Sequence, residues 1–329
     1  MPNIVQRPND PYIYLYVMGE WYCYNPREPL IGSGAMGDVY RGYRCKTSSV
    51  VAIKRVKDSY ANNKQIRDRA RQEASLAFRH PNLVEMVGCC EYEPGRGPMF
   101  LISNFVNGED VDQYVAKMGD TPGRVEKICH IISMVLDALD YVHSKGIVHR
   151  DVKPSNIMVE QGQNVRLMDL GIARMNGGNS FSAFGFIGTP EYAAPEQILR
   201  EQDGKNVNIN AATDIYALGI TFYELLTGTN PMNSDKDVEV LDRQMHKPLP
   251  PDKSIPPRLM KVILKATEKD PLRRYQTANE MKLAIKQALE PEPTPGQRFK
   301  QWMADNVVVV SAILACLVVI ALLITIILI

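Results

Sequence analysis

The spacing of apolar residues divides this chain into a front part with strand-like runs and a later part with helical periodicity. Up to about residue 106, short runs rich in β-branched and aromatic residues predominate, such as "SVVAIKRV" and "MFLISNFV". A helical segment at about 62–78 interrupts them. In "TPGRVEKICHIISMVLDALDYVHSKG", apolar residues recur at helical spacing, and Thr121 and Pro122 predict the start of a helix and Gly146 its end. We therefore expect an α+β fold with two subdomains.

The start of the chain and its Pro-rich segment differ from the body between them. Residues 1–28 contain two aromatic runs around Met18-Gly19-Glu20, which predict a β-hairpin. This extension can widen the front sheet, cap the lobe or mediate contacts, and the sequence leaves these roles open. The first residues lack a basic stretch followed by an apolar one, so we expect no signal peptide. Residues 291–306 begin within "EPEPTPGQ", which predicts a linker.

Residues 307–329 form an apolar run. It contains no charged residue, and 17 of its 23 residues are Val, Ile or Leu. As a helix it measures about 35 Å, against roughly 30 Å for the hydrocarbon core of a bilayer. Arg298 and Lys300 precede the run, and Trp302 is suited to the membrane interface. We expect a single-pass transmembrane helix that contacts lipid and holds a cytoplasmic body at the cell membrane.

Composition excludes some classes of partner and site. Lys and Arg number 38 against 37 for Asp and Glu, a near balance that argues against binding to nucleic acid. The six cysteines form no CxxC pair, so we expect neither a zinc site nor a disulfide framework.

A glycine-rich stretch, "GSGAMGDV" at 32–39, matches G-x-G-x-x-G-x-V. Its glycines allow the backbone to approach phosphate oxygens closely. A dinucleotide-binding turn and a plain tight turn are the alternatives. The first needs a helix directly after the glycines, whereas "DVYRGYR" is typical of a strand. Further on, Lys54 ends the strand "VAIK", and Glu73 in the next helix is a plausible partner that would let Lys54 face phosphates.

A second group of polar residues follows the long helix in "HRDVKPSN". Asp151 can accept a hydroxyl proton, and Lys153 can stabilise a phosphoryl group in transfer. Asn156, together with Asp169 of "DLG", offers hard oxygen ligands for Mg²⁺. The later "GTPEYAAPEQ" contains the sequence A-P-E, ending in Glu196.

These motifs occur in the order and rough spacing of the protein-kinase motifs. The chain resembles the eukaryotic-like (Hanks-type) Ser/Thr protein kinases, most closely the bacterial membrane-anchored branch, over about 29–290. The resemblance implies a two-lobed kinase fold, with a small β-rich lobe at 29–106 and a helical lobe at 107–290. It implies a non-specific serine/threonine protein kinase that acts in signal transduction. Such an enzyme transfers the γ-phosphate of ATP to proteins, itself included, with Mg²⁺, or Mn²⁺ in its place.

The resemblance also assigns roles at the active site. The catalytic residues would be Asp151, Lys153 and Lys54. The ATP site would comprise Ile31, Gly32, Gly34, Gly37, Val39, Ala52, Lys54, Glu73, Ser103, Phe105 and Asp110. Asn156 and Asp169 would hold the metal. Ser103 stands at the back of the adenine pocket, where the family commonly has a bulkier side chain.

Other positions match supporting roles in the family. Asp214 would brace the "HRD" backbone, and Arg274 would pair with Glu196. His80, His143 and His149 are expected to be structural.

Regulation is expected in the activation segment at 169–196. Ser180, Ser182 and Thr189 are its candidate phosphoacceptors, through self-association and trans-autophosphorylation. Two other functions remain open. A nucleotide-binding scaffold should lack Lys54, Asp151, Asn156 or Asp169, and all four are present. The segment "GTPEYAAPE" argues against a small-molecule kinase.

Overall fold

The computed structural model describes residues 3–34, 37–60, 63–76, 78–93, 95–170, 189–203, 208–291, 295–313, 315, 317 and 320. The chain divides into two compact units, 1–288 and 289–329, and each is described by itself. The first unit contains all the residues expected to bind ATP or to catalyse transfer.

An antiparallel sheet forms the N-terminal lobe of the first unit. Its strands are β1 (Ile4–Gln6), β2 (Ile13–Val17), β3 (Glu20–Tyr24), β4 (Gly32–Ser33), β5 (Gly37–Arg44), β6 (Val50–Val56), β7 (Met86–Glu93) and β8 (Arg96–Asn104). Their spatial order is β1-β2-β3-β5-β6-β8-β7, with β4 paired to β5. The predicted hairpin is β2–β3. Met18 and Gly19 at its turn both have positive φ, 50° and 84°, as a tight two-residue hairpin turn requires.

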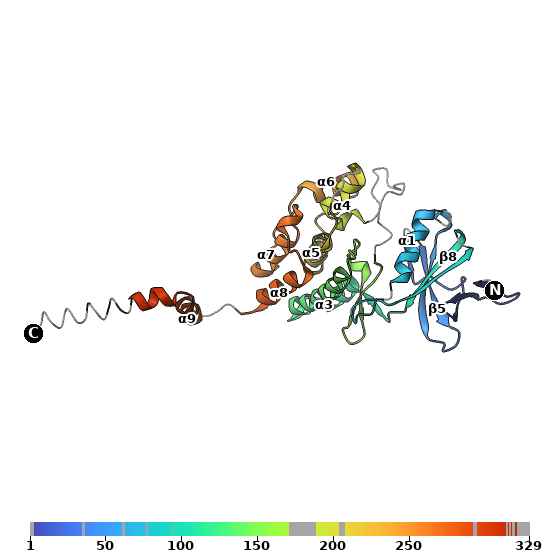
Figure 1. Cartoon of the computed structure of the whole chain (residues 1–329), viewed down its shortest axis with the longest axis horizontal. Helices are drawn as coiled ribbons and strands as arrows, with labels where there is room; N and C mark the ends of the chain where they lie inside the picture. The colour runs from blue at the N-terminus through green and yellow to red at the C-terminus, as the bar shows by residue number, and fades with distance from the viewer. Residues whose placement is uncertain are drawn as a thin grey trace, which may run out of the picture. The chain divides into compact units, whose positions relative to one another are not determined.

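Strand β8 shows that the sheet is buried on both faces. Met99 and Leu101 point into a cluster shared with helix α1 (Lys64–Ser75), which lies against the sheet (Figure 1). The alternate residues, Phe100 and Ile102, belong to a second cluster on the other face, as period-two alternation dictates. The N-terminal hairpin contributes four buried residues to this second cluster: Leu15, Val17, Tyr22 and Tyr24.

The N-terminal extension therefore widens the sheet and covers its outer face. β3 pairs with β5, with Cys23 opposite Tyr43. At the other edge of the sheet, β1 and β2 contact β7, and the Cys90 thiol donates to the carbonyl of Asn3 (3.3 Å).

The second lobe is mainly helical. Its helices are α2 (Val111–Met118), α3 (Arg124–Ser144), α4 (Pro195–Asp203), α5 (Ala211–Thr227), α6 (Asp237–His246), α7 (Pro257–Ala266) and α8 (Ala278–Leu289). A small sheet, β9 (Gly108–Asp110), β10 (Ile157–Glu160) and β11 (Val165–Leu167), joins them. The predicted long helix, α3, begins at Arg124 and not at Pro122, because Gly123 takes a left-handed conformation (φ 79°) that delays the start. Helix α5 is buried along most of its length and packs against α3 and α7.

The second unit contains α9 (Pro295–Asp305). Across the part of the chain that the structure describes, no helix combines the length and the apolar character needed to cross a bilayer. Most of the predicted transmembrane segment, 307–329, lies outside the described residues.

Candidate active site

The expected catalytic loop, residues 149–156, follows α3, and the carboxylate of Asp214 in α5 holds its backbone. The backbone N–H groups of His149 and Arg150 donate to its two carboxylate oxygens (2.8 and 2.7 Å), and His143 Nε2 lies 2.7 Å from Oδ2. Asp214 has no exposed surface. Burial alone would raise its pKa, but the hydrogen bonds from His143 and the Arg150 N–H outweigh burial and lower the pKa. Arg150 can therefore hold a left-handed backbone (φ 66°), a conformation that costs energy and needs such support.

Asp151, in the same loop, lies at the centre of a polar network. The Asn156 side-chain amide donates to the Asp151 carboxylate (3.0 Å) and to its carbonyl (2.7 Å). Lys153 Nζ lies 3.5 Å from the same carboxylate and donates to the Thr189 hydroxyl (2.7 Å). The network fixes a carboxylate acceptor, Asp151, beside an ammonium group, Lys153, which are the two kinds of group expected for proton transfer from a hydroxyl.

Lys54 of β6 and Asp169 form an ion pair. Lys54 Nζ donates to Asp169 Oδ2 at 2.9 Å, and this ammonium holds the pKa of Asp169 below its usual range. Asp169 also has positive φ, 47°. The expected partner of Lys54, Glu73, lies on α1, but its side chain is outside the described residues.

The oxygen ligands predicted for Mg²⁺ come from adjoining segments. The backbone N–H of Met168 donates to the carbonyl of Asn156 (2.8 Å), which places the residue before Asp169 against Asn156. Because the Asn156 amide nitrogen donates to Asp151, the amide oxygen is the atom of this side chain that a metal ion would use. One amide oxygen and one carboxylate fit Mg²⁺, which takes few protein ligands and completes its shell with phosphate and water.

The expected ATP-binding residues lie along one face of three strands. Across β5, β6 and β8, Val39 pairs with Lys54, and Ala52 with Ser103. Gly32 pairs with Val39 in the sheet. The Gly34 N–H donates to the Gly37 carbonyl (2.9 Å), so the two arms of the glycine-rich stretch are joined by a backbone hydrogen bond. A Cβ at Gly37 would lie 2.4 Å from the Arg55 carbonyl, so only glycine fits this close approach. Residues 35 and 36 are outside the described residues.

The remaining predicted ATP contacts lie at the margins of this face. Ile31 is 45% exposed, and its N–H donates to the Val39 carbonyl (2.9 Å). Phe105 follows β8, and its ring lies 5.3 Å from the Arg41 guanidinium. Asp110 ends β9; burial and then the Asp112 carboxylate raise its pKa.

A model of the protein kinase domain matches residues 26–287 of this chain. The chain belongs to the protein kinase family. The predicted kinase fold, with a β-rich and a helical lobe, is thereby confirmed. Serine/threonine-protein kinase pkn3 of Myxococcus xanthus is 32% identical over 293 residues, which cover 84% of this chain and 52% of that one. PrkC of Bacillus subtilis is 31% identical over 277 residues, which cover 82% and 41%. This kinase chain thus spans about half, or less, of the length of these curated relatives.

Solved structures agree with the family assignment. The crystal structure of the Mycobacterium tuberculosis PknI kinase domain matches with a TM-score of 0.61 and 25% identity, covering 81% of this chain and 95% of that one.

Part of the activation segment of this kinase can be placed. Residues 171–188 are outside the described residues, and with them the phosphoacceptor candidates Ser180 and Ser182. The third candidate, Thr189, is described and is held by Lys153. After it, Glu196 accepts two hydrogen bonds from Arg274 (2.7 and 2.9 Å), and both residues are 2% exposed. Thr213 also donates to Glu196 (2.8 Å), so the expected pair lies in a satisfied buried network.

Sequence reasoning missed several residues around this kinase site. Gln197 donates to the Arg150 carbonyl (3.2 Å) and accepts from the Ala194 N–H (3.1 Å), which ties α4 to the catalytic loop. A pocket of about 260 Å³ adjoins Lys153 and Thr189 and is also lined by Glu224. Gln197 directly follows the A-P-E motif, but its contact with the catalytic loop is made to Arg150, 47 residues away, which the motif does not specify.

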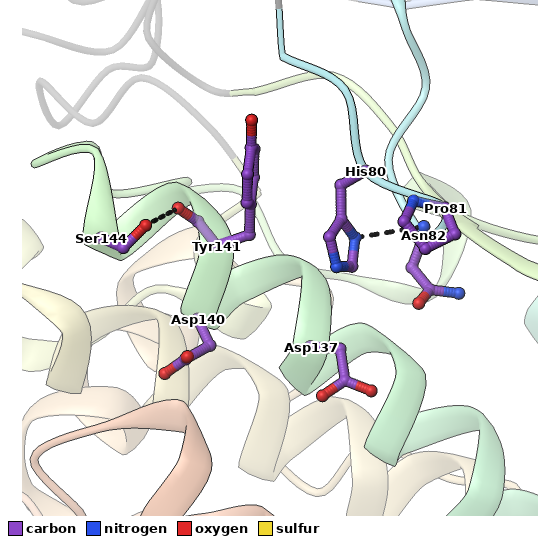
Figure 2. A pocket seen from close by; sticks show the side chains of 7 residues that line it. All are labelled: His80, Pro81, Asn82, Asp137, Asp140, Tyr141 and Ser144. Carbon is purple, nitrogen blue, oxygen red and sulfur yellow. Dashed lines mark hydrogen bonds between the residues drawn. The ribbon is translucent and has the colours of Figure 1, made fainter.

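A larger pocket, of about 410 Å³, has none of the predicted catalytic residues in its lining (Figure 2). It lies between the loop that carries His80 and helix α3. The His80 ring stacks on Tyr141 (5.2 Å between centroids, 26° between planes), which fits the structural role expected for this histidine. On the same helix, Asp137 accepts from Lys282 of α8 (2.6 and 2.8 Å), so the acidic side of the pocket is partly neutralised.

Proposed function

We propose that this chain is an ATP-dependent serine/threonine protein kinase that phosphorylates proteins, itself included. The observation that carries the proposal is the connected network of Asp151, Lys153, Asn156 and Thr189 beside the Lys54–Asp169 pair. The relatives named above are described as serine/threonine-protein kinases, which supports the same specificity.

The mechanism follows from the positions of these groups. When bound, ATP and Mg²⁺ supply the phosphoryl group and neutralise its charge. The Asp151 carboxylate orients the substrate hydroxyl and takes its proton, and Lys153 stabilises negative charge next to it. Asn156 and Asp169 would hold the metal, and Lys54 would face the phosphates. Positioning and electrostatics provide most of the rate enhancement, because the transition state is loose and its charge lies on oxygens.

The test compares two aspartates of similar chemistry. The full-length chain, purified in detergent, is incubated with labelled ATP, Mg²⁺ and a protein substrate. Asp151→Asn should lower transfer about 10²–10⁴-fold. Asp140→Asn, on the exposed side of α3, should leave it unchanged. Transfer by both Asp151 forms would exclude this catalytic assignment. Nucleotide binding without transfer by the wild type would favour the scaffold function.

We further propose that 307–329 anchors this kinase to a membrane as a single transmembrane helix. The support is the uncharged run of 23 residues and the preceding Arg298 and Lys300. Expressed in cells, the full chain should resist extraction from membranes at high pH, whereas a chain lacking 307–329 should be released. Equal release of both would contradict the anchor.

We also propose trans-autophosphorylation in the activation segment at Ser180, Ser182 or Thr189. The wild-type kinase should phosphorylate the Asp151→Asn form at one or more of these residues. Mapping by mass spectrometry that finds phosphate only elsewhere would contradict this.

A further inference from the structure

Helix α1 carries Glu73, the expected partner of Lys54, yet α1 has little apolar surface with which to hold the sheet. The helix contributes Ile66, Ala70 and Ala74 to the cluster between them. The other members are Val56, Met86, Cys89, Met99 and Leu101 of the sheet and Tyr60 before the helix. Two of the three helix residues are alanines, which bury only a methyl group each. Hydrophobic contact alone is therefore a weak determinant of the position of α1.

Arg67 supplies a second contact between α1 and the sheet. Its side chain is only 1% exposed, although arginine is rarely buried without partners. The guanidinium donates to the carbonyls of Gly97 (2.7 Å), Glu93 (3.2 Å) and Arg96 (3.4 Å), all in or next to the turn between β7 and β8. This turn therefore forms a socket of carbonyl oxygens around a side chain of α1.

Glu91 of β7 closes the socket and reaches a second arginine. It forms an ion pair with Arg67, accepts from Arg71 Nη2 (3.0 Å), and accepts from the Gly95 N–H (3.2 Å). Arg67 and Arg71 are one turn apart on the same face of α1. The Glu91 carboxylate is only 12% exposed, and burial alone would raise its pKa. The hydrogen bonds from Arg71 and Arg67 outweigh burial and lower the pKa to about 2, so Glu91 is charged at neutral pH.

The segment that follows α1 is fixed to the helical lobe. The Asn82 side chain donates to the Val165 carbonyl (3.0 Å), and the Val84 N–H donates to the Leu167 carbonyl (3.1 Å). Glu73 thus lies between two fixed points, the socket in the N-terminal lobe and the attachment of this segment to β11.

We propose that Glu91 is a positioning residue that holds α1, and with it Glu73, in register with Lys54. The inference rests on the proposed kinase function, because it concerns how ATP is held for transfer. Glu91 acts through the helix and touches neither ATP nor the protein substrate. Disengaging it should impair the use of ATP and leave recognition of the protein substrate intact.

The experiment compares two glutamates of the same strand in the full-length chain. Glu91→Gln keeps the shape of the side chain and removes its charge, whereas Glu93→Gln changes an exposed side chain whose residue contributes only its carbonyl. For Glu91→Gln, kcat/KM for ATP should fall of the order of tenfold to a hundredfold, with KM for the protein substrate unchanged. Glu93→Gln should match the wild type. If Glu91→Gln also matches it, the proposal is wrong.

A double-mutant cycle tests whether Glu91 acts through Glu73. Once Glu73→Gln has been introduced, Glu91→Gln should cause little further loss, because both changes disrupt one interaction. If the double variant instead loses activity by the product of the two single-variant factors, Glu91 does not act through Glu73, and the proposal is wrong. If Glu91→Gln does not fold, Arg71→Gln, at a 39% exposed side chain, should show a smaller loss confined to ATP; no loss would overturn the proposal.

Hydrogen exchange separates this inference from the proposed function. If the wild type transfers no phosphate, the proposed function fails. The position of α1 can still be judged, because its amides should exchange faster in Glu91→Gln than in the wild type or Glu93→Gln. Equal exchange in all three would refute the positioning role.

Discussion

Leu15 tests whether the N-terminal hairpin is an integral part of the kinase lobe. The side chain has no exposed surface and belongs to the cluster that covers the outer face of the sheet, with Ile53, Phe100 and Ile102. Leu15→Ala removes three carbons, worth about 0.8 kcal/mol each, and leaves a cavity, so we expect a loss of about 3 kcal/mol. For a domain of this size that corresponds to roughly 6–12 °C in melting temperature.

The next residue provides the control. Tyr16 is 41% exposed on the opposite face of β2, where its ring packs against Trp21 (5.1 Å between centroids). Tyr16→Ala should cost at most about 1 kcal/mol. In a Trp302→Phe background, Trp21 is the only tryptophan, so its fluorescence reports the hairpin, while far-ultraviolet circular dichroism reports the helices.

The two signals distinguish the outcomes of urea unfolding. If the hairpin belongs to the lobe, Leu15→Ala shifts the fluorescence transition to lower urea and moves at least part of the dichroism transition with it. A shift in fluorescence with unchanged dichroism would mean that the hairpin unfolds alone. Equal midpoints for the wild type and Leu15→Ala would refute the buried outer cluster itself.

Three further results are expected. Ser103→Met should weaken inhibitors with a large group behind the adenine by at least about tenfold, roughly 1.4 kcal/mol, in a kinase assay, and equal inhibition of both forms would contradict it. Glu196→Gln leaves the buried charge of Arg274 without its counter-charge and should lower the free energy of unfolding, measured in urea, by about 3–5 kcal/mol. An unchanged urea midpoint would show that the pair does not stabilise the fold. Burial, and then Arg274, lower the pKa of Lys269 from 10.5 to about 8, so the unfolded chain binds more protons between these values. Stability should therefore rise from pH 8 toward 10.5, and Lys269→Met should remove the rise in urea midpoint; an equal rise in both forms would contradict this assignment.

Motifs and periodicity predicted much of the fold, because both depend on local spacing. The run "MFLISN" predicts a strand, and its alternation is visible in Met99 and Phe100, which face opposite clusters. The segments that cover the two faces of the sheet are distant from this strand in the sequence, so its alternation does not identify them. Whether the hairpin at 13–24 caps the sheet, extends it or stands apart depends on pairing between β3 and β5, which periodicity does not specify.

The same division applies to charged residues. Asp214 was predicted to brace the catalytic loop because it lies in a motif whose neighbours are recognisable in order. Glu91 has partners 20 and 24 residues away, Arg71 and Arg67, in a helix whose charged pattern is typical of a solvated face. Yet Arg67 is among the most deeply buried side chains described.

The composition of α1 nevertheless indicates how the helix is held, because it contains few apolar residues and three arginines. A helix expected to present Glu73 to Lys54 has to be fixed on the sheet, and "KQIRDRARQEAS" offers one isoleucine and two alanines for that purpose. Where so little apolar surface is available, the position has to be set by directional contacts, which in this helix means its arginines. A buried carboxylate and backbone carbonyls on the sheet are the groups that satisfy two guanidinium ions. The deficit of apolar residues in α1 thus predicts an acidic partner on the neighbouring strands, and β7 supplies it in Glu91.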